Sequence, residues 1–193
     1  MIDTRKDHSN LVGWLSIISG ILLIPEIVLA AALGFVSFDV YAFVTPLHVF
    51  NLAITTFVLF MFRSLLNNQF DFHRADILIT LLIIFNIIFF IMGILELATY
   101  TRELNPDAEP LLSIVDKVLY ITFGLLTITF GVVLHKLRDD LFGLLKPYAF
   151  ATIGSGVCGA TLILAPVGKL AAAVAYVTLG MIFLRAKREA DIL

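Results

Sequence analysis

The chain has 193 residues, of which 60% are hydrophobic and 15% are charged, and its formal net charge at neutral pH is −2. Soluble domains hold roughly 45–50% apolar and about 25% charged residues, so this composition excludes an ordinary soluble protein. The small net charge, with no long block of like charge, gives no reason to expect nucleic acid as a partner. The composition instead predicts a membrane protein, with the lipid bilayer as its first partner.

Six apolar runs lie between charged or turn-forming breaks, and each is a candidate membrane span. A helix needs about 20 mostly apolar residues to cross a hydrocarbon core about 30 Å thick. The predicted spans cover residues 11–36, 41–62, 76–100, 111–134, 148–166 and 169–184. None shows the alternating pattern of a lipid-facing strand. The prediction is therefore an all-α integral membrane protein, with one polytopic domain over residues 1–193.

The first predicted span, 11–36, contains an ionisable residue, Glu26, directly after Pro25. The run exceeds the 7–15-residue core of a signal peptide, so we expect it to be a retained span. A charged residue inside a spanning helix costs at least about 2.5–3.5 kcal/mol on insertion scales, so it is normally neutral, paired or facing water. Pro25 lacks a backbone N–H and is expected to free a carbonyl one turn earlier.

The second predicted span, 41–62, places His48 at nearly the depth of Glu26. With a rise of about 1.5 Å per residue, Glu26 lies about 24 Å and His48 about 22 Å from the inner edges of their spans. Asn51 is expected on the same face of the second helix, about one turn from His48. Glu26, His48 and Asn51 are thus the candidate proton or ligand site. The alternative is structural: a protonated or singly hydrogen-bonded Glu26, with His48 at the end of its helix.

The third and fourth spans, 76–100 and 111–134, carry Glu96, Asp116 and Lys117 near the expected outer boundary. Helical rise from Asp76 and from Lys136 puts Glu96 and Asp116 about 30 Å outward, where they reach headgroups or water. We interpret the three as an outer rim, and a Glu96–Lys117 pair is expected to act as an anchor.

The last two spans, 148–166 and 169–184, are short, and Pro166 to Gly168 between them reads as a tight hairpin turn. Thr152, Gly156 and Ala160 form a line of small residues that favours close approach of these two helices. Residues 118–126 also match residues 174–182, with Tyr, Thr and Gly in register. The match suggests hairpin repeats, although coincidence in an apolar alphabet is an equal alternative.

Basic residues lie mostly on one side of the predicted spans. That side holds Arg5, Lys6, Arg63, Arg74, Lys136, Arg138, Lys146, Arg185, Lys187 and Arg188, whereas only Arg102 and Lys169 lie clearly on the other. Cytoplasmic loops carry the excess of Lys and Arg, so both termini are expected to be cytoplasmic, in the cell (inner or plasma) membrane.

The motifs of several enzyme classes are missing from the sequence. It has no HExxH, GxSxG or P-loop pattern, its four histidines are not paired at matched depth for haem, and Cys158 is its single cysteine. We therefore predict no catalytic residues, no metal site and no cofactor. Two hypotheses follow: a small carrier or channel for a proton-linked or other small solute, or a non-catalytic accessory subunit of a membrane complex. Either would work as a homo-oligomer or with membrane-protein partners.

Overall fold

The computed structural model describes residues 4–32, 41–100, 109–137 and 141–190 of the chain. Within those ranges, the side chains of residues 4–8, 30–32, 41–43, 69, 96–100, 109–113 and 187–190 are outside the description. Glu96, one of the predicted rim residues, is therefore placed on its helix, but its side chain lies outside the described residues.

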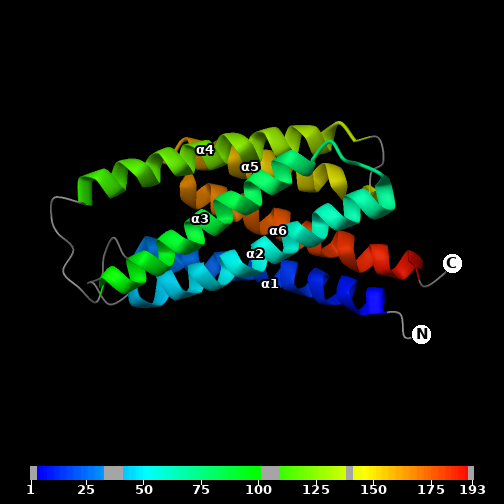
Figure 1. The fold of residues 1–193 in the computed structure, drawn as a ribbon, viewed down its shortest axis with the longest axis horizontal. Helices are drawn as coiled ribbons and strands as arrows, with labels where there is room; N and C mark the ends of the chain where they lie inside the picture. The colour runs from blue at the N-terminus through cyan, green and yellow to red at the C-terminus, as the bar shows by residue number, and fades with distance from the viewer. Residues whose placement is uncertain (1–3, 33–40, 101–108, 138–140, 191–193) are drawn as a thin grey trace.

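The described residues form six α-helices and no strand, as the all-α prediction requires. The helices are α1 (Thr4–Ala32), α2 (Tyr41–Phe70), α3 (Asp76–Tyr100), α4 (Glu109–His135), α5 (Leu145–Ala160) and α6 (Ala165–Ala190). They form an elongated bundle in which the two termini lie at the same end, called here the termini end (Figure 1). Five of the helices, all except α5, are long and apolar enough to cross a membrane.

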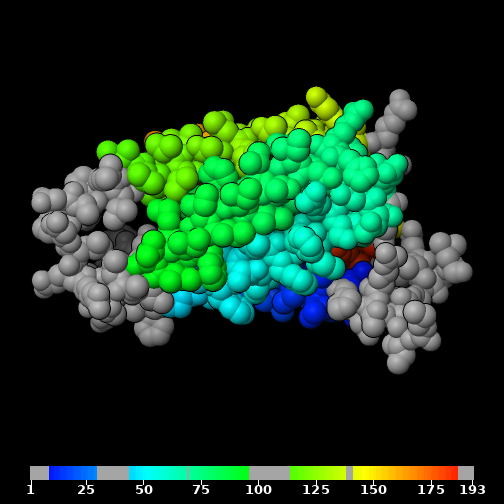
Figure 2. Space-filling model, in the orientation of Figure 1, coloured from blue at the N-terminus to red at the C-terminus, as the bar shows by residue number. Residues whose placement is uncertain are grey.

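Packing between helices follows the order of the chain, and the contact between α6 and α1 closes it into a ring. α1 packs against α6, α6 against α5, α5 against α4, α4 against α3, α3 against α2 and α2 against α1. The α3–α4 contact is the least extensive of the six. α3 crosses the front of the bundle beside α2, and together they form most of the face seen in Figure 2. Side chains from all six helices line a cavity inside the ring.

The boundary between α5 and α6 differs from the prediction. α5 ends at Ala160, and α6 begins at Ala165 and runs for 26 residues, far beyond the predicted span 169–184. The chain turns at residues 161–164, where Leu162 has a positive φ of 56°. Pro166 is thus in the first turn of α6 and not in the hairpin turn, because a proline there loses no helical hydrogen bond and has a suitable φ.

α2 is also longer than predicted, because Arg63 does not end it. The Arg63 Nε donates a hydrogen bond to Asp76 Oδ1 at 3.0 Å, and the Asn67 amide donates to the same oxygen at 2.8 Å. Asp76 stands in the first turn of α3, where an acidic residue suits the helix dipole. These contacts join α2 and α3 into a hairpin and let α2 continue to Phe70.

The leucines of residues 135–147 predict either an extension of α4 or a short helix at the membrane interface, and the described residues 136–137 and 141–144 form neither. α4 ends at His135, and Leu141–Gly143 make a single 3₁₀ turn in which Phe142 has φ 64°. Arg185 donates a hydrogen bond from Nη1 to the Phe142 carbonyl oxygen at 3.0 Å. Because Leu141 and Leu145 are buried in the main core, these leucines pack on the bundle.

Glycines allow close backbone approach between neighbouring helices of the ring. A Cβ added at Gly180 in α6 would lie 2.6 Å from the Gly13 carbonyl oxygen in α1, and one added at Gly156 in α5 would lie 2.7 Å from the Gly124 carbonyl oxygen in α4. Gly156 itself faces α4 and not α6, but the predicted close approach of α5 and α6 is present at Gly168, where an added Cβ would lie 3.1 Å from the Ser155 carbonyl oxygen. The sequence shows which positions are small, but it does not show which helix each one meets.

Candidate functional site

Glu26 is fully buried although it is ionisable, and it lies six residues before the end of α1, away from the termini end of the bundle. Its side chain has 0% relative exposure. α1 is helical both before and after Pro25, so the proline does not end the helix next to Glu26. Burial of an unpaired carboxylate is costly, so its partners decide what this residue does.

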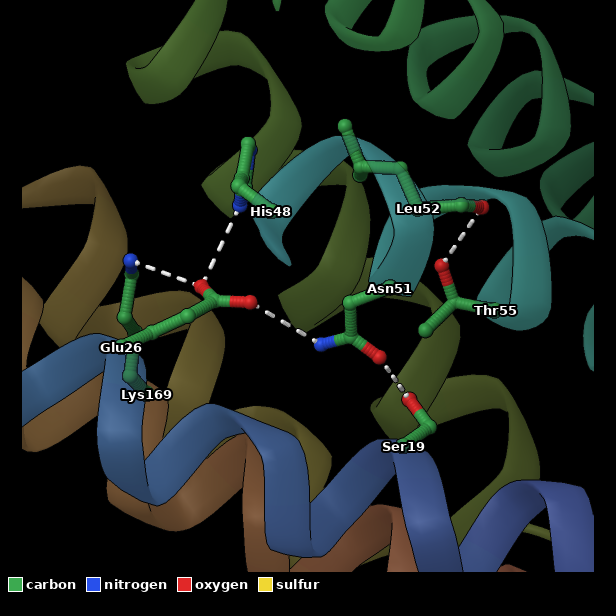
Figure 3. A network of polar contacts seen from close by, with 7 residues as sticks. All are labelled: Ser19, Glu26, His48, Asn51, Leu52, Thr55 and Lys169. Atoms are coloured by element: carbon green, nitrogen blue, oxygen red, sulfur yellow. Dashed lines mark hydrogen bonds and ion pairs between the residues drawn. The ribbon is translucent and has the colours of Figure 1, made fainter. Parts of the chain in front are cut away.

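Three side chains from two other helices converge on the Glu26 carboxylate (Figure 3). His48 Nδ1 lies 3.2 Å from Oε2, and the Asn51 amide donates to Oε1 at 3.3 Å. Lys169 Nζ donates to Oε2 at 3.2 Å. The expected meeting of Glu26, His48 and Asn51 is thus present in the structure. The carboxylate has more partners than a single structural hydrogen bond would supply.

His48 lies well inside α2. The helix begins at Tyr41, so His48 is about two turns from its start and does not cap it. Its side chain keeps 28% relative exposure while Glu26 keeps none. The imidazole therefore lies between the buried carboxylate and a more open region.

Lys169 belongs to this site, and the sequence analysis missed it. Interpreting Pro166 to Gly168 as a turn placed Lys169 at the outer edge of the span 169–184, where a lysine was counted only toward topology. In the structure α6 begins at Ala165, so Lys169 lies in the second turn of the helix, with its side chain 32% exposed. A signal was present in the sequence, since Pro166 followed by small and apolar residues is also the pattern of a helix start.

Asn51 extends the polar contacts from Glu26 along α1 and α2. Its side-chain oxygen accepts a hydrogen bond from Ser19 Oγ at 2.7 Å, and both residues are buried. One turn further along α2, Thr55 Oγ1 accepts a hydrogen bond from Asn86 of α3 at 3.4 Å. Asn51 therefore has a partner on each side of its amide, which fixes its orientation.

A cavity of about 160 Å³ lies beside this site, and we call it the Lys169 cavity. His48, Asn51 and Lys169 are at its polar end, whereas Glu26 does not line it. Its remaining wall is mainly apolar or small and comes from all six helices. It includes Leu23, Leu52, Phe89, Tyr120, Phe123, Gly124, Gly156, Gly159 and Ala172. The cavity thus has a polar end and an apolar body.

A second cavity of about 80 Å³, the Tyr148 cavity, adjoins the first toward the termini end. The two share Phe123, Thr127, Ser155, Ala172 and Tyr176 in their walls. Beyond it, four buried rings pack edge to face, those of Phe62, Phe130, Tyr148 and Phe183. The Phe62 ring centroid lies 5.5 Å from that of Tyr148, and Phe130 and Tyr148 of this ring cluster also line the Tyr148 cavity.

The predicted outer rim is only partly close to the site. Asp116 is half-buried and near enough to His48 to interact with it electrostatically. Lys117 is exposed, and no contact described for it joins it to Glu26, His48, Asn51 or Lys169. The predicted Glu96–Lys117 pair lies outside the described side chains.

No family model, no curated protein and no solved structure matches the chain, so the function proposed below depends on its own residues.

Proposed function

We propose that the chain is an integral, multi-pass protein of the cell (inner or plasma) membrane, with six crossings and both termini cytoplasmic. The five long apolar helices support this proposal, as does the exposure of large apolar side chains along them. On α3 the exposed set is Ile77, Leu81, Ile84, Ile87, Ile91, Ile94 and Leu95. The orientation follows from the excess of Lys and Arg near the termini end.

We further propose that the protein is a small carrier or channel for a proton-linked or other small solute. The observation that carries this proposal is a fully buried carboxylate, Glu26, held by His48, Asn51 and Lys169 at the polar end of a cavity. Intramembrane ionisable residues that contact one another commonly mark proton or solute pathways. Histidine can exchange a proton near neutral pH, and here it separates the carboxylate from the more open region.

Solute-driven proton movement in proteoliposomes tests this function. The purified chain is reconstituted with a pH-sensitive dye inside the vesicles, and gradients of small carboxylates, amines and neutral solutes are applied in turn. We expect at least one class to move protons faster than in protein-free vesicles. Glu26→Gln should abolish the difference while the protein still elutes as a folded species. Lys136→Gln, at an exposed lysine outside the site, is the matched control.

The alternative function is that of a non-catalytic accessory subunit, in which the site is a structural polar cluster. The complete pairing of Glu26 by three side chains favours this alternative, because such a cluster also specifies helix packing. It predicts that no solute class moves protons, and that Glu26→Gln alters only stability or assembly with a partner protein.

A further inference from the structure

The charge that faces the Lys169 cavity is positive, although the residue at the centre of the site is acidic. The cavity wall contains Lys169, His48 and Asn51, and neither Glu26 nor Asp116 belongs to it. Glu26 lies behind these side chains and has no exposed surface. A solute in the cavity therefore meets an ammonium group, an imidazole and an amide before it meets a carboxylate.

Hydrogen-bond donors at this end of the cavity remain available to a solute. A lysine ammonium has three donors, and Glu26 Oε2 takes one of those of Lys169. His48 uses Nδ1 toward Glu26, and its second ring nitrogen has no hydrogen bond described in this part of the chain. A carboxylate matches the Lys169 ammonium and, when the His48 ring carries both of its protons, the second N–H of that ring as well. Such charge-assisted hydrogen bonds are the stronger kind.

The body of the cavity suits a flat, compact apolar group. On one side Phe89 packs its ring against those of Tyr120 and Phe123, with centroids 4.9 Å and 5.5 Å apart. On the other side the wall is formed by glycines and alanines that present little side chain, among them Gly156, Gly159 and Ala172. A cavity of about 150 Å³ lined by apolar groups accepts benzene, so about 160 Å³ is suited to a ring with one small substituent.

We propose that the Lys169 cavity binds a small monocarboxylate with an aromatic or similarly compact apolar body. The carboxylate lies at Lys169 and His48, and the body lies between the Phe89 ring cluster and the small residues of α5. Glu26 acts as a positioning residue, because it holds both donors at the end of the cavity. This inference rests on the proposed function for its site, and it names the class of solute.

Benzoate binding to the full chain in detergent tests the inference, with benzylamine and benzyl alcohol as probes of inverted and absent charge. Calorimetric titration at neutral pH should show saturable benzoate binding at one site per chain. The two comparators should bind at least tenfold more weakly, and benzyl alcohol also reports partition into the micelle. Equal or tighter binding of benzylamine, or no saturable benzoate binding, would overturn the inference.

Two variants locate the binding. Lys169→Gln should weaken benzoate binding at least tenfold, whereas Lys136→Gln should leave it unchanged. If Lys169→Gln does not fold, Gly159→Leu serves instead, because a Cβ at Gly159 meets no atom within 4 Å and a larger side chain there fills the cavity. Undiminished binding in a folded variant of either kind contradicts the inference.

The outcomes also separate this inference from the proposed function. Benzoate binding without any solute-driven proton movement would leave the binding site intact and remove the carrier. Proton movement driven only by amines or neutral solutes, with no benzoate binding, would keep the carrier and remove the carboxylate.

Discussion

The Glu26 carboxylate and the Lys169 ammonium stabilise each other's burial. Glu26 has no exposed surface, and Lys169 is the partner that can carry a permanent positive charge at neutral pH. Removing one member of a buried pair is more damaging than removing both, because the remaining charge loses its compensation. The pair therefore behaves as a unit, with His48 and Asn51 completing its hydrogen bonds.

A double-mutant comparison checks this coupling. We expect Lys169→Met to lower the thermal unfolding midpoint in detergent, measured by circular dichroism, because it leaves Glu26 buried without its cation. Adding Glu26→Gln should recover part of the loss, with a coupling free energy of about 0.5–3 kcal/mol. Lys136→Met is the surface control. Strictly additive losses in the double variant would show that the two side chains act independently.

The sequence predicted part of this site, and the missing part has a physical reason. Glu26, His48 and Asn51 could be found because polar residues stand out within apolar runs, and helical rise gives their relative depth. Lys169 was missed because its role depends on where α6 begins. The helix starts at Ala165 and not at the predicted residue 169, which moves Lys169 from the edge of the span into the second turn of the helix.

At the scale of helices, close contacts at glycines hold the ring together. Gly180 in α6 meets the backbone of α1, and Gly124 in α4 meets the backbone of α5. Gly124 and Gly180 occupy the same position in the predicted match of residues 118–126 with 174–182. Tyr120 and Tyr176 also occupy the same position in that match, and both line the Lys169 cavity. The hairpin repeat stays a prediction, but both copies have the same packing role. In contrast, α3 meets α4 through aromatic side chains.

Alanine substitutions at two glycines distinguish a close helix contact from open space. Gly180→Ala should destabilise the protein by about 1–3 kcal/mol, because the new methyl group meets backbone atoms that have to move. Gly159→Ala should be neutral or slightly stabilising, because its methyl group meets nothing within 4 Å and alanine favours a helix. Unfolding midpoints in the same detergent compare them. Equal effects would contradict the packing described for α1 and α6.

The sequence also predicted the helices unequally well. The prediction for α3, 76–100, coincides with the observed helix, because charged or turn-forming residues flank its apolar run on both sides. α2 and α6 extend beyond their predicted ends, since Arg63 finds Asp76 and Arg185 finds the Phe142 carbonyl. A charged residue ends an apolar run in the sequence, but it does not end a helix when a partner is present.

For the whole molecule, α5 decides the number of crossings in the proposed membrane topology. It has 16 residues and so spans about 24 Å, which is less than a hydrocarbon core of about 30 Å. Its packing between α4 and α6 shields it from lipid on two sides. With α5 as a sixth crossing, the two termini lie on the same side of the membrane.

Reporter fusions test this topology. Green fluorescent protein fused to either terminus should fluoresce in a bacterial host, because both ends are expected in the cytoplasm, where the reporter folds. Alkaline phosphatase inserted between residues 101 and 108 should be active, since that segment is expected outside. Fluorescence from only one terminus would indicate an odd number of crossings.

The central claim is that the solute site is complete within one chain, because Glu26, His48, Asn51 and Lys169 and both cavities come from the same six helices. Native mass spectrometry of the chain, released gently from its own membranes at its normal expression level, tests this claim most directly. We predict the mass of one chain or an integer multiple of it, with a small bound solute retained. A stoichiometric complex with other proteins would contradict the claim and assign the buried Glu26 cluster to an accessory subunit.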